Sequence, residues 1–277
     1  MLPLSVTPVN AEGMSTTPPA RAAAPGVALV TGGTSGIGLE FAHQLAARGH
    51  DLVLVARDQT RLRAVAEELS RTHGVAVDVL VADLVDRAQL ATVEARLQAT
   101  ERPVRLLVNN GGYGLKHDFL DNTVDDEQAH LDVHVVAVMR LTHAALGAML
   151  AHGGGAVINV ASVSAFLPRG SYGAAKAYVV NLSRWADLKY AATGVRVMAL
   201  APGFVKTEFH GRMDVDRGRA PGLLWLDADR VVREALADLD AGKSLSVPTK
   251  RYKAIVGAAR LVPQGVLARF SSMGRGD

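Results

Sequence analysis

A tyrosine and a lysine four residues apart, Tyr172 and Lys176, are the pair of side chains in this 277-residue chain best suited to proton transfer. On a helix this spacing places both on one face. A phenol has an ordinary pKa near 10, so it exchanges protons poorly at neutral pH, and a nearby ammonium lowers that pKa by stabilising the phenolate. The pair predicts a general acid for carbonyl reduction or a general base for alcohol oxidation. The alternative is a surface pair without a catalytic role.

A serine precedes this pair, just after an apolar run at 156–160. We expect the hydroxyl of Ser162 to hold the substrate oxygen and to stabilise the negative charge that develops on it. Ser164 is the competing candidate.

Glycines follow the first apolar run of the chain, Val27–Thr31, and open a predicted helix. Gly32 permits a tight turn, Gly36 lets the backbone approach a pyrophosphate, and Gly38 lets the helix pack close to the sheet. A helix N-terminus also offers free N–H groups to phosphates. The turn predicts dinucleotide binding rather than an ordinary strand–helix turn, through Gly32, Thr34, Ser35, Gly36, Ile37 and Gly38.

The second apolar run, 51–57, ends in Arg57. An acidic residue there would accept hydrogen bonds from the ribose 2′-hydroxyl of NAD(H). A guanidinium instead suits a 2′-phosphate. We therefore predict NADP(H) in preference to NAD(H), the alternative being a solvated surface arginine.

Apolar runs alternate with helical patterns along most of the chain. Strands are expected at 27–31, 51–57, 75–81, 106–109, 156–160, 195–200 and 245–247, and helices at 39–48, 60–70, 87–100, 125–152, 172–193 and 227–240. Such alternation requires crossover connections. It predicts an α/β fold with a single Rossmann-type, doubly wound parallel sheet of about seven strands and helices on both faces. Ligands of such sheets bind beyond the carboxyl ends of the strands, where each of these motifs falls.

The motif T-G-x-x-x-G-I-G at 31–38, together with N-N-G-G at 109–112, Ser162, Y-x-x-x-K and P-G at 202–203, resembles the classical short-chain dehydrogenase/reductase family over roughly 27–247. The resemblance implies NADP(H) with the arginine, and oligomers formed through the helices at 125–152 and 172–193. It also implies that Lys176 binds the nicotinamide ribose. Other cofactor contacts that it implies are Asp83 and Leu84 beside the adenine, Asn110 and Gly111 after the fourth strand, and Pro202, Gly203, Val205 and Thr207 near the nicotinamide.

Three positions depart from the family pattern. His134 lies where the family has an asparagine that supports a water linked to the lysine, and it is either a replacement in that proton relay or a buried structural imidazole. Gly111 stands in place of alanine, and Ser162 and Tyr172 are separated by about two residues fewer than expected. Asp83 has a second interpretation, as the cap of the helix near Arg87.

The segment 208–225 contains several glycines and a proline, and we expect it to be a mobile lid. An apolar pocket is expected from Tyr113, Phe166, Leu167, Phe209, Met213, Leu223, Leu224 and Trp225. Such a pocket favours a hydrophobic ketone, aldehyde or secondary alcohol.

We expect a disordered tail at 1–25, a catalytic dinucleotide-binding domain at 26–248 and a helical extension at 249–277. The net charge of +3 and the absence of a basic stripe argue against a nucleic-acid partner. No cysteine, no signal-like start and no run of 18 apolar residues are present, so we expect a cytoplasmic protein without membrane contact. The scattered histidines (His43, His130, His143 and His152) predict no metal site. The competing functional hypotheses are a non-catalytic, dinucleotide-binding regulatory protein of the same fold, and a lipid-surface protein built around the basic and apolar residues of the C-terminal segment.

Overall fold

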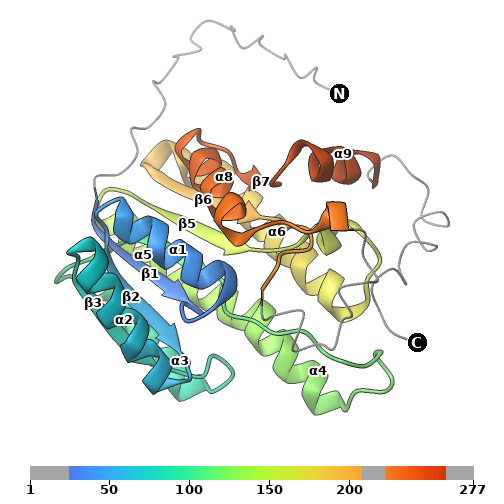
Figure 1. Cartoon of the computed structure of the whole chain (residues 1–277), viewed down its shortest axis with the longest axis horizontal. Coiled ribbons are helices and arrows are strands. Elements are labelled where there is room, and N and C mark those ends of the chain that lie inside the picture. The colour runs from blue at the N-terminus through green and yellow to red at the C-terminus, as the bar shows by residue number, and fades with distance from the viewer. Residues whose placement is uncertain (1–24, 208–221, 260–277) are drawn as a thin grey trace, which may run out of the picture.

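Seven parallel strands form one sheet in the order β3-β2-β1-β4-β5-β6-β7 in a computed structural model of the chain (Figure 1). The structure describes residues 25–207 and 222–259. The predicted tail at 1–25, most of the 208–225 segment and the end of the 249–277 extension therefore lie outside the described residues. The strands are β1 (Val27–Thr31), β2 (Asp51–Ala56), β3 (Val77–Val81), β4 (Val104–Asn109), β5 (Gly155–Val160), β6 (Val195–Leu200) and β7 (Leu245–Ser246).

The helices of the described residues lie between these strands, apart from the last one, which follows β7. They are α1 (Gly36–Ala47), α2 (Gln59–His73), α3 (Arg87–Gln98), α4 (Val124–Leu131), α5 (Val138–Ala151), α6 (Gly170–Tyr190), α8 (Ala228–Asp240) and α9 (Lys250–Ala259). The chain runs outward from β1 to β3 and then crosses to β4 on the other side of β1. The gap between β1 and β4 is therefore the topological switch point, where ligands of such sheets bind. The predicted doubly wound fold is confirmed.

The strands bury alternate residues in two cores, as the two-residue period of a strand requires. On one face Val30, Leu54 and Val108 pack with α1, α2 and α8. On the other, Leu29 and Val55 pack with α3 and α5. Because both faces are covered, the strands read in the sequence as continuous apolar runs.

The helix predicted at 125–152 is interrupted, which corrects the sequence-based expectation. A capping box between Thr123 and Asp126 starts α4, and a π-helical segment, Asp132–Ala137, separates α4 from α5. Apolar spacing does not distinguish a π-helical turn from an α-helical one, so this pattern could not predict the interruption.

This interrupted helix, Val124–Ala151, is the one stretch of the described residues that is long and apolar enough to cross a membrane by length and composition. Half of its most apolar window is buried inside the fold, and Leu141, Ala145 and Met149 pack against the sheet. A buried core helix can have the same length and apolar composition, so these two properties alone do not identify a membrane span.

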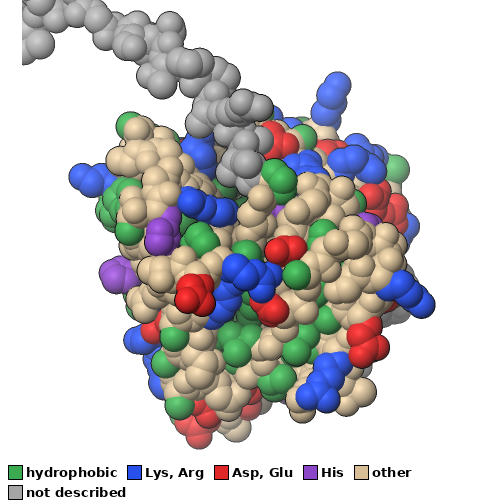
Figure 2. Space-filling model, turned by 90° about the vertical axis from the view of Figure 1, so that its left-hand side faces the viewer, with side chains coloured by type: hydrophobic (Ala, Val, Ile, Leu, Met, Phe, Trp, Pro, Cys, Tyr) green, Lys and Arg blue, Asp and Glu red, His purple; other side chains and the backbone are tan. Residues whose placement is uncertain are grey.

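Basic and acidic side chains are interspersed on the face of the molecule shown in Figure 2. Among the described residues, Arg102 pairs with Asp51 and Asp78 at 3.2 and 3.0 Å. Such exposed pairs contribute little stability, and the mixed surface agrees with the small net charge.

Candidate active site

The glycine-rich turn connects β1 to α1 at the switch point. Gly32 and Gly36 have φ of +65° and +56°, a backbone region that favours glycine. A Cβ on Gly38 would lie 2.2 Å from the carbonyl oxygen of Gly32, so only glycine lets α1 start this close to the strand. Helix α1 begins at Gly36, three residues earlier than the sequence pattern predicted.

The β1–α1 turn is held in place by Asn110. The Asn110 side-chain amide donates to the carbonyl oxygens of Thr31 and Gly32 at 3.0 and 3.3 Å. The Thr31 hydroxyl oxygen accepts from the backbone N–H groups of Asn110 and Gly111, both at 2.9 Å. Asn110 was predicted as a cofactor contact, and its side chain here joins the end of β4 to the glycine-rich turn.

Gly111 makes room for a neighbouring side chain. A Cβ at this position would lie 3.0 Å from Cδ1 of Leu84, a tight but flexible contact. Glycine at position 111, where the family has alanine, thus leaves room for Leu84, which we predict to lie beside the adenine.

Arg57 and Asp83 follow β2 and β3 at the same edge of the sheet and lie 3.7 Å apart, with the Arg57 side chain 70% exposed. Asp83 does not cap α3, because Asp86 is the N-cap and accepts from the N–H groups of Ala88 and Gln89. The helix-cap interpretation of Asp83 is therefore wrong. Its carboxylate instead accepts from the Val85 N–H at 3.0 Å and faces the guanidinium of Arg57.

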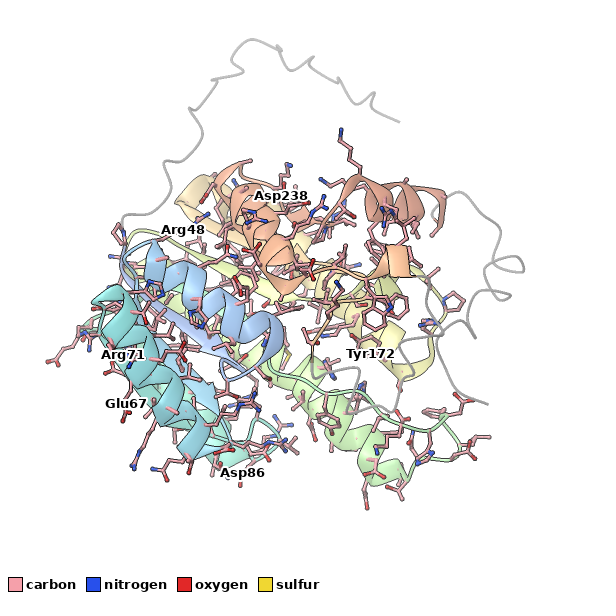
Figure 3. The ribbon with its side chains drawn as sticks, in the orientation of Figure 1. Arg48, Glu67, Arg71, Asp86, Tyr172 and Asp238 are labelled. Atoms are coloured by element: carbon pink, nitrogen blue, oxygen red, sulfur yellow. The ribbon has the colours of Figure 1, made fainter. Side chains whose placement is uncertain are left out.

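Ser162 and Tyr172 meet beyond the carboxyl end of β5. Ser162 caps a short 3₁₀ turn, Val163–Phe166, by accepting from the Ser164 N–H at 3.1 Å, and it is also hydrogen-bonded to Tyr172. Ser164 itself is buried. Figure 3 shows Tyr172 at the side of α6 that faces α4. The two predicted catalytic hydroxyls thus lie together, and the loop between them is compact.

Lys176 lies one turn along α6 from Tyr172. Its ammonium donates to the carbonyl oxygen of Val160 at 2.8 Å and lies 5.6 Å from the centre of the Tyr172 ring. Burial lowers the pKa of Lys176 to about 7. Burial also raises the pKa of Tyr172 to about 12, although the hydrogen bond from Ser162 and the charge of Arg169 act in the opposite direction. The expected lowering of the tyrosine pKa by the lysine is therefore not found in the protein alone, because desolvation dominates.

His134 lies in the π-helical segment and is almost fully buried. Its Nε2 lies 2.7 Å from the carbonyl oxygen of Tyr113, which can only accept, so Nε2 carries the proton and Nδ1 is free to accept. Nδ1 is buried and has no hydrogen-bond partner among the described residues. Burial, and then the charge of Lys176, lower the pKa of His134 well below 6.5, so the imidazole is neutral at physiological pH.

Sequence reasoning missed His130, which we had grouped with the scattered histidines. It lies one turn before His134, with ring centres 4.4 Å apart, and its ring centre is 5.9 Å from that of Tyr172. Both of its nitrogens are buried without a hydrogen-bond partner in the described part of the chain, and burial lowers its pKa to about 4. The i, i+4 spacing of the two histidines was the available signal, but it does not reveal that α6 packs on this face.

The segment after β6 brings the remaining predicted residues to the same edge. The Pro202 carbonyl oxygen accepts from the Val163 N–H at 3.0 Å, which ties this segment to the turn after Ser162. Further along, the side chain of Thr207 reaches the glycine turn, where a Cβ on Gly36 would lie 3.1 Å from it. Segments about 170 residues apart in sequence thus meet at the switch point.

Only some of the residues predicted to form the apolar pocket lie near one another in the described part of the chain. Tyr113 stacks near His130 and His134, with ring centres 5.8 and 6.2 Å away. Trp225 lies against Phe204, with ring centres 5.4 Å apart. Phe166 instead packs against the core, and Leu223 is 69% exposed. Phe209 and Met213 lie outside the described residues.

A nicotinamide dinucleotide fits the polar groups at this edge. Ser35, at the N-cap of α1, makes no side-chain capping hydrogen bond, so the first N–H groups of the helix are available to a phosphate. Arg57 provides an exposed cation at the end of β2. No group of three or more histidine, aspartate or glutamate side chains placed to hold a metal ion occurs in residues 25–207 and 222–259.

Comparison with known proteins agrees with this geometry. Residues 26–217 match the family model described as short chain dehydrogenase. Galactitol 2-dehydrogenase (L-tagatose-forming) from Cereibacter sphaeroides is 34% identical over 86% of this chain and 93% of its own length.

Two solved structures share the fold along almost their whole length. The short-chain dehydrogenase from Sphingobium yanoikuyae in complex with NADPH is 36% identical, with a TM-score of 0.78 over 88% of this chain and 95% of that protein. The bulky-bulky ketone specific alcohol dehydrogenase from Comamonas testosteroni is 30% identical, with a TM-score of 0.75 over 89% and 95%. The chain therefore belongs to the short-chain dehydrogenase/reductase family of oxidoreductases.

Proposed function

We propose that this protein is an NADP(H)-dependent oxidoreductase that interconverts a hydrophobic ketone or aldehyde and the corresponding alcohol, with Tyr172 as the general acid–base. The observation that carries the proposal is the meeting of Ser162, Tyr172 and Lys176 beyond β5, beside the switch point. A bound nicotinamide would supply or accept the hydride at the substrate carbon.

The protein groups complete the reaction by moving one proton. In the reductive direction, Tyr172 donates its proton to the carbonyl oxygen as that oxygen gains charge, while the Ser162 hydroxyl stabilises the same oxygen. The alcohol direction reverses these roles. The high pKa of Tyr172 in the protein alone keeps the phenol protonated, ready for reduction. A cationic nicotinamide and a protonated Lys176 would favour the phenolate needed for oxidation.

We assign His134 the task of holding a water that links Lys176 to bulk solvent. Its unpartnered Nδ1 is an acceptor in a buried polar site, and the two nitrogens of His130 add further hydrogen-bonding capacity there. Buried polar groups of this kind are normally satisfied by ordered water. Because both imidazoles are neutral, they act as fixed partners of the water rather than as charged carriers of the proton.

The cofactor preference rests on Arg57. Its guanidinium is exposed at the end of β2, where a 2′-phosphate would receive charge-assisted hydrogen bonds. Asp83 lies close enough to orient the guanidinium. Because the two charged groups are 3.7 Å apart and exposed to solvent, the carboxylate does not fully neutralise the charge of Arg57. The NADPH complex of the Sphingobium protein supports the same assignment.

A homo-oligomer in the cytoplasm completes the proposal. Helix α6 exposes Tyr178, Trp185 and Leu188 at 36, 52 and 86%. Tyr178 and Trp185 line a shallow hollow of about 220 Å³ with Asn181 and Leu182.

Light scattering of the wild type and of Trp185→Glu tests this proposed interface on α6. The substitution is expected to lower the mass to that of one chain, and an unchanged mass would contradict an interface at this face.

Turnover of a panel of apolar ketones and aldehydes tests the enzymatic proposal, followed as the loss of NADPH absorbance and repeated with NADH. We expect turnover with NADPH in preference to NADH. NADPH binding without turnover of any carbonyl or alcohol would favour the regulatory, non-catalytic alternative instead.

A further inference from the structure

Gly203 faces an aromatic ring from the C-terminal part of the chain. A Cβ on Gly203 would lie 1.8 Å from Cζ of Tyr252 and 2.2 and 2.3 Å from the two Cε atoms. Tyr252 comes from α9 and is only 3% exposed. Residue 203 therefore has no room for a side chain because of this ring, an explanation that involves no ligand.

The hydroxyl of Tyr252 joins two segments. It accepts a hydrogen bond from the Phe204 N–H at 3.0 Å and donates one to the carbonyl oxygen of Leu224 at 2.7 Å. Beyond this point the two segments pair with each other. The Leu226 N–H donates to the Phe204 carbonyl oxygen at 2.8 Å, and the Lys206 N–H donates to the Leu226 carbonyl oxygen at 2.9 Å. The phenol thus closes one end of a short ladder around Val205.

Tyr252 is itself held firmly. The N–H of Thr249 donates to Glu234 of α8 at 2.7 Å, and the Thr249 hydroxyl accepts from the Tyr252 N–H at 3.4 Å. Val256, one turn further along α9, is buried in the core that α8 shares. Figure 1 shows α8 and α9 at the upper edge of the molecule, with β7 between them. A ring anchored from two elements can fix the backbone against which it packs.

We propose that Tyr252 is a positioning residue for the nicotinamide half of the cofactor. Its ring and hydroxyl fix the backbone from Gly203 to Val205, and this backbone carries Thr207 to the glycine turn at Gly36. The inference rests on the proposed function, because it requires a nicotinamide to bind along residues 202–207. It gives the start of the C-terminal extension a role at the site, although that extension lies outside the family motifs.

Two ligands separate this role from a general structural one. NADP⁺ contains the nicotinamide, whereas 2′,5′-ADP carries only the adenosine half with its 2′-phosphate. In Tyr252→Phe the ring stays and both hydrogen bonds of the hydroxyl are lost. We expect the Kd for NADP⁺ to rise roughly tenfold, as for the loss of a net hydrogen bond, and the KM for NADPH to rise with it. The Kd for 2′,5′-ADP should change less than about threefold, because this ligand lacks the nicotinamide that binds along residues 202–207. The kcat at saturating NADPH should also change less than about threefold, because the cofactor is then already bound against this segment.

Tyr190→Phe, the same substitution at the last residue of α6, is the control and should change neither constant. Equal weakening of both ligands by Tyr252→Phe, or unchanged binding of NADP⁺, would overturn the positioning role. A wild-type protein that binds neither ligand would instead refute the proposed function.

The ring contact is tested separately by adding a methyl group. Gly203→Ala should weaken NADP⁺ binding by more than tenfold in the wild type, and by much less in a Tyr252→Ala background, where the space is free. Contacting residues give this kind of non-additive effect. Equal effects of Gly203→Ala in the two backgrounds would show that the ring does not set the backbone position.

Discussion

Gly112 and His134 pack so closely that a Cβ on Gly112 would lie 2.4 Å from Cε1 of the imidazole. Gly112, which follows β4, thus leaves the space that the imidazole of His134 fills. Alanine at 112 would push the ring away from its 2.7 Å contact with the Tyr113 carbonyl oxygen. The histidine that departs from the family pattern is fixed in place by a neighbour that accommodates it.

The first prediction follows from this contact. Gly112→Ala should lower kcat by roughly tenfold or more, because a displaced imidazole no longer holds the water beside Lys176. The smaller asparagine in Gly112→Ala/His134→Asn should restore most of this loss, while His134→Asn alone stays near wild type. Steady-state kinetics with NADPH measure the effect, and a double variant no better than Gly112→Ala would contradict the matched packing.

The second prediction concerns proton transfer. Tyr172→Phe keeps the ring and removes the acid, so kcat should fall by roughly 10²–10⁴-fold, the usual contribution of general acid–base catalysis. The Kd for NADPH should change little. Tyr190→Phe, at the last residue of the same helix, is the matched control. If Tyr172→Phe turns over at the wild-type rate, another group donates the proton.

The third prediction concerns cofactor choice. Arg57→Ala removes the cation that faces a 2′-phosphate, and charge-assisted hydrogen bonds contribute about 1.5–3 kcal/mol, so kcat/KM for NADPH should fall roughly 10- to 100-fold. The value for NADH should stay within about threefold. Arg63→Ala, an exposed arginine on α2, serves as the control. A proportional loss with both cofactors would argue against a 2′-phosphate contact.

The fourth prediction concerns stability and pH. The folded-state pKa of Lys176 is about 7, against 10.5 when exposed. Between these two values the unfolded chain binds one more proton at this position than the folded protein does. The free energy of unfolding contributed by this group therefore rises with pH across the window, by up to about 1.4 kcal/mol per pH unit, and the full penalty is present below pH 7.

Urea unfolding of the cofactor-free protein between pH 7 and pH 9.5 measures this slope. Lys176→Met removes the buried amine and should flatten the profile, and it should be more stable than the wild type at pH 7. Lys189→Met, an exposed lysine on α6, should keep the wild-type slope. Identical slopes for all three proteins would mean that Lys176 is hydrated in the folded state.

The fold was readable from the sequence because burial on both faces turns each strand into an apolar run. Val27–Thr31 and Val195–Leu200 were predicted with their observed bounds. The π-helical segment was not predictable, since its residues keep the apolar spacing of the flanking helices. The early start of α1 at Gly36 was also missed, because glycine is a poor helix former and its pattern gives no apolar period.

Site residues were predictable where a local motif carried them, and not where tertiary contacts decide. Ser162 and Tyr172 come together as expected, because both follow from the position of β5 and α6. The direction of the pKa shift of Tyr172 depends on how much water the surrounding fold removes, which no local spacing encodes. His130 and Tyr252 reach the candidate site only through the packing of α4 and α9, so no local motif predicts their positions.

The π-helical turn at Asp132–Ala137 makes the site sensitive to chain length as well as to residue type. Such a turn holds one residue more than an α-helix of the same rise. Deleting a single residue here would let the backbone close into a regular helix with α4 and α5 in nearly the same relative orientation, because the π-helical turn accommodates one extra residue. The imidazole of His130 would still face Tyr172, but the side chains within the segment, that of His134 among them, would point in new directions even though they were still present. Among natural relatives, gaps within these six positions should accordingly be rarer than substitutions.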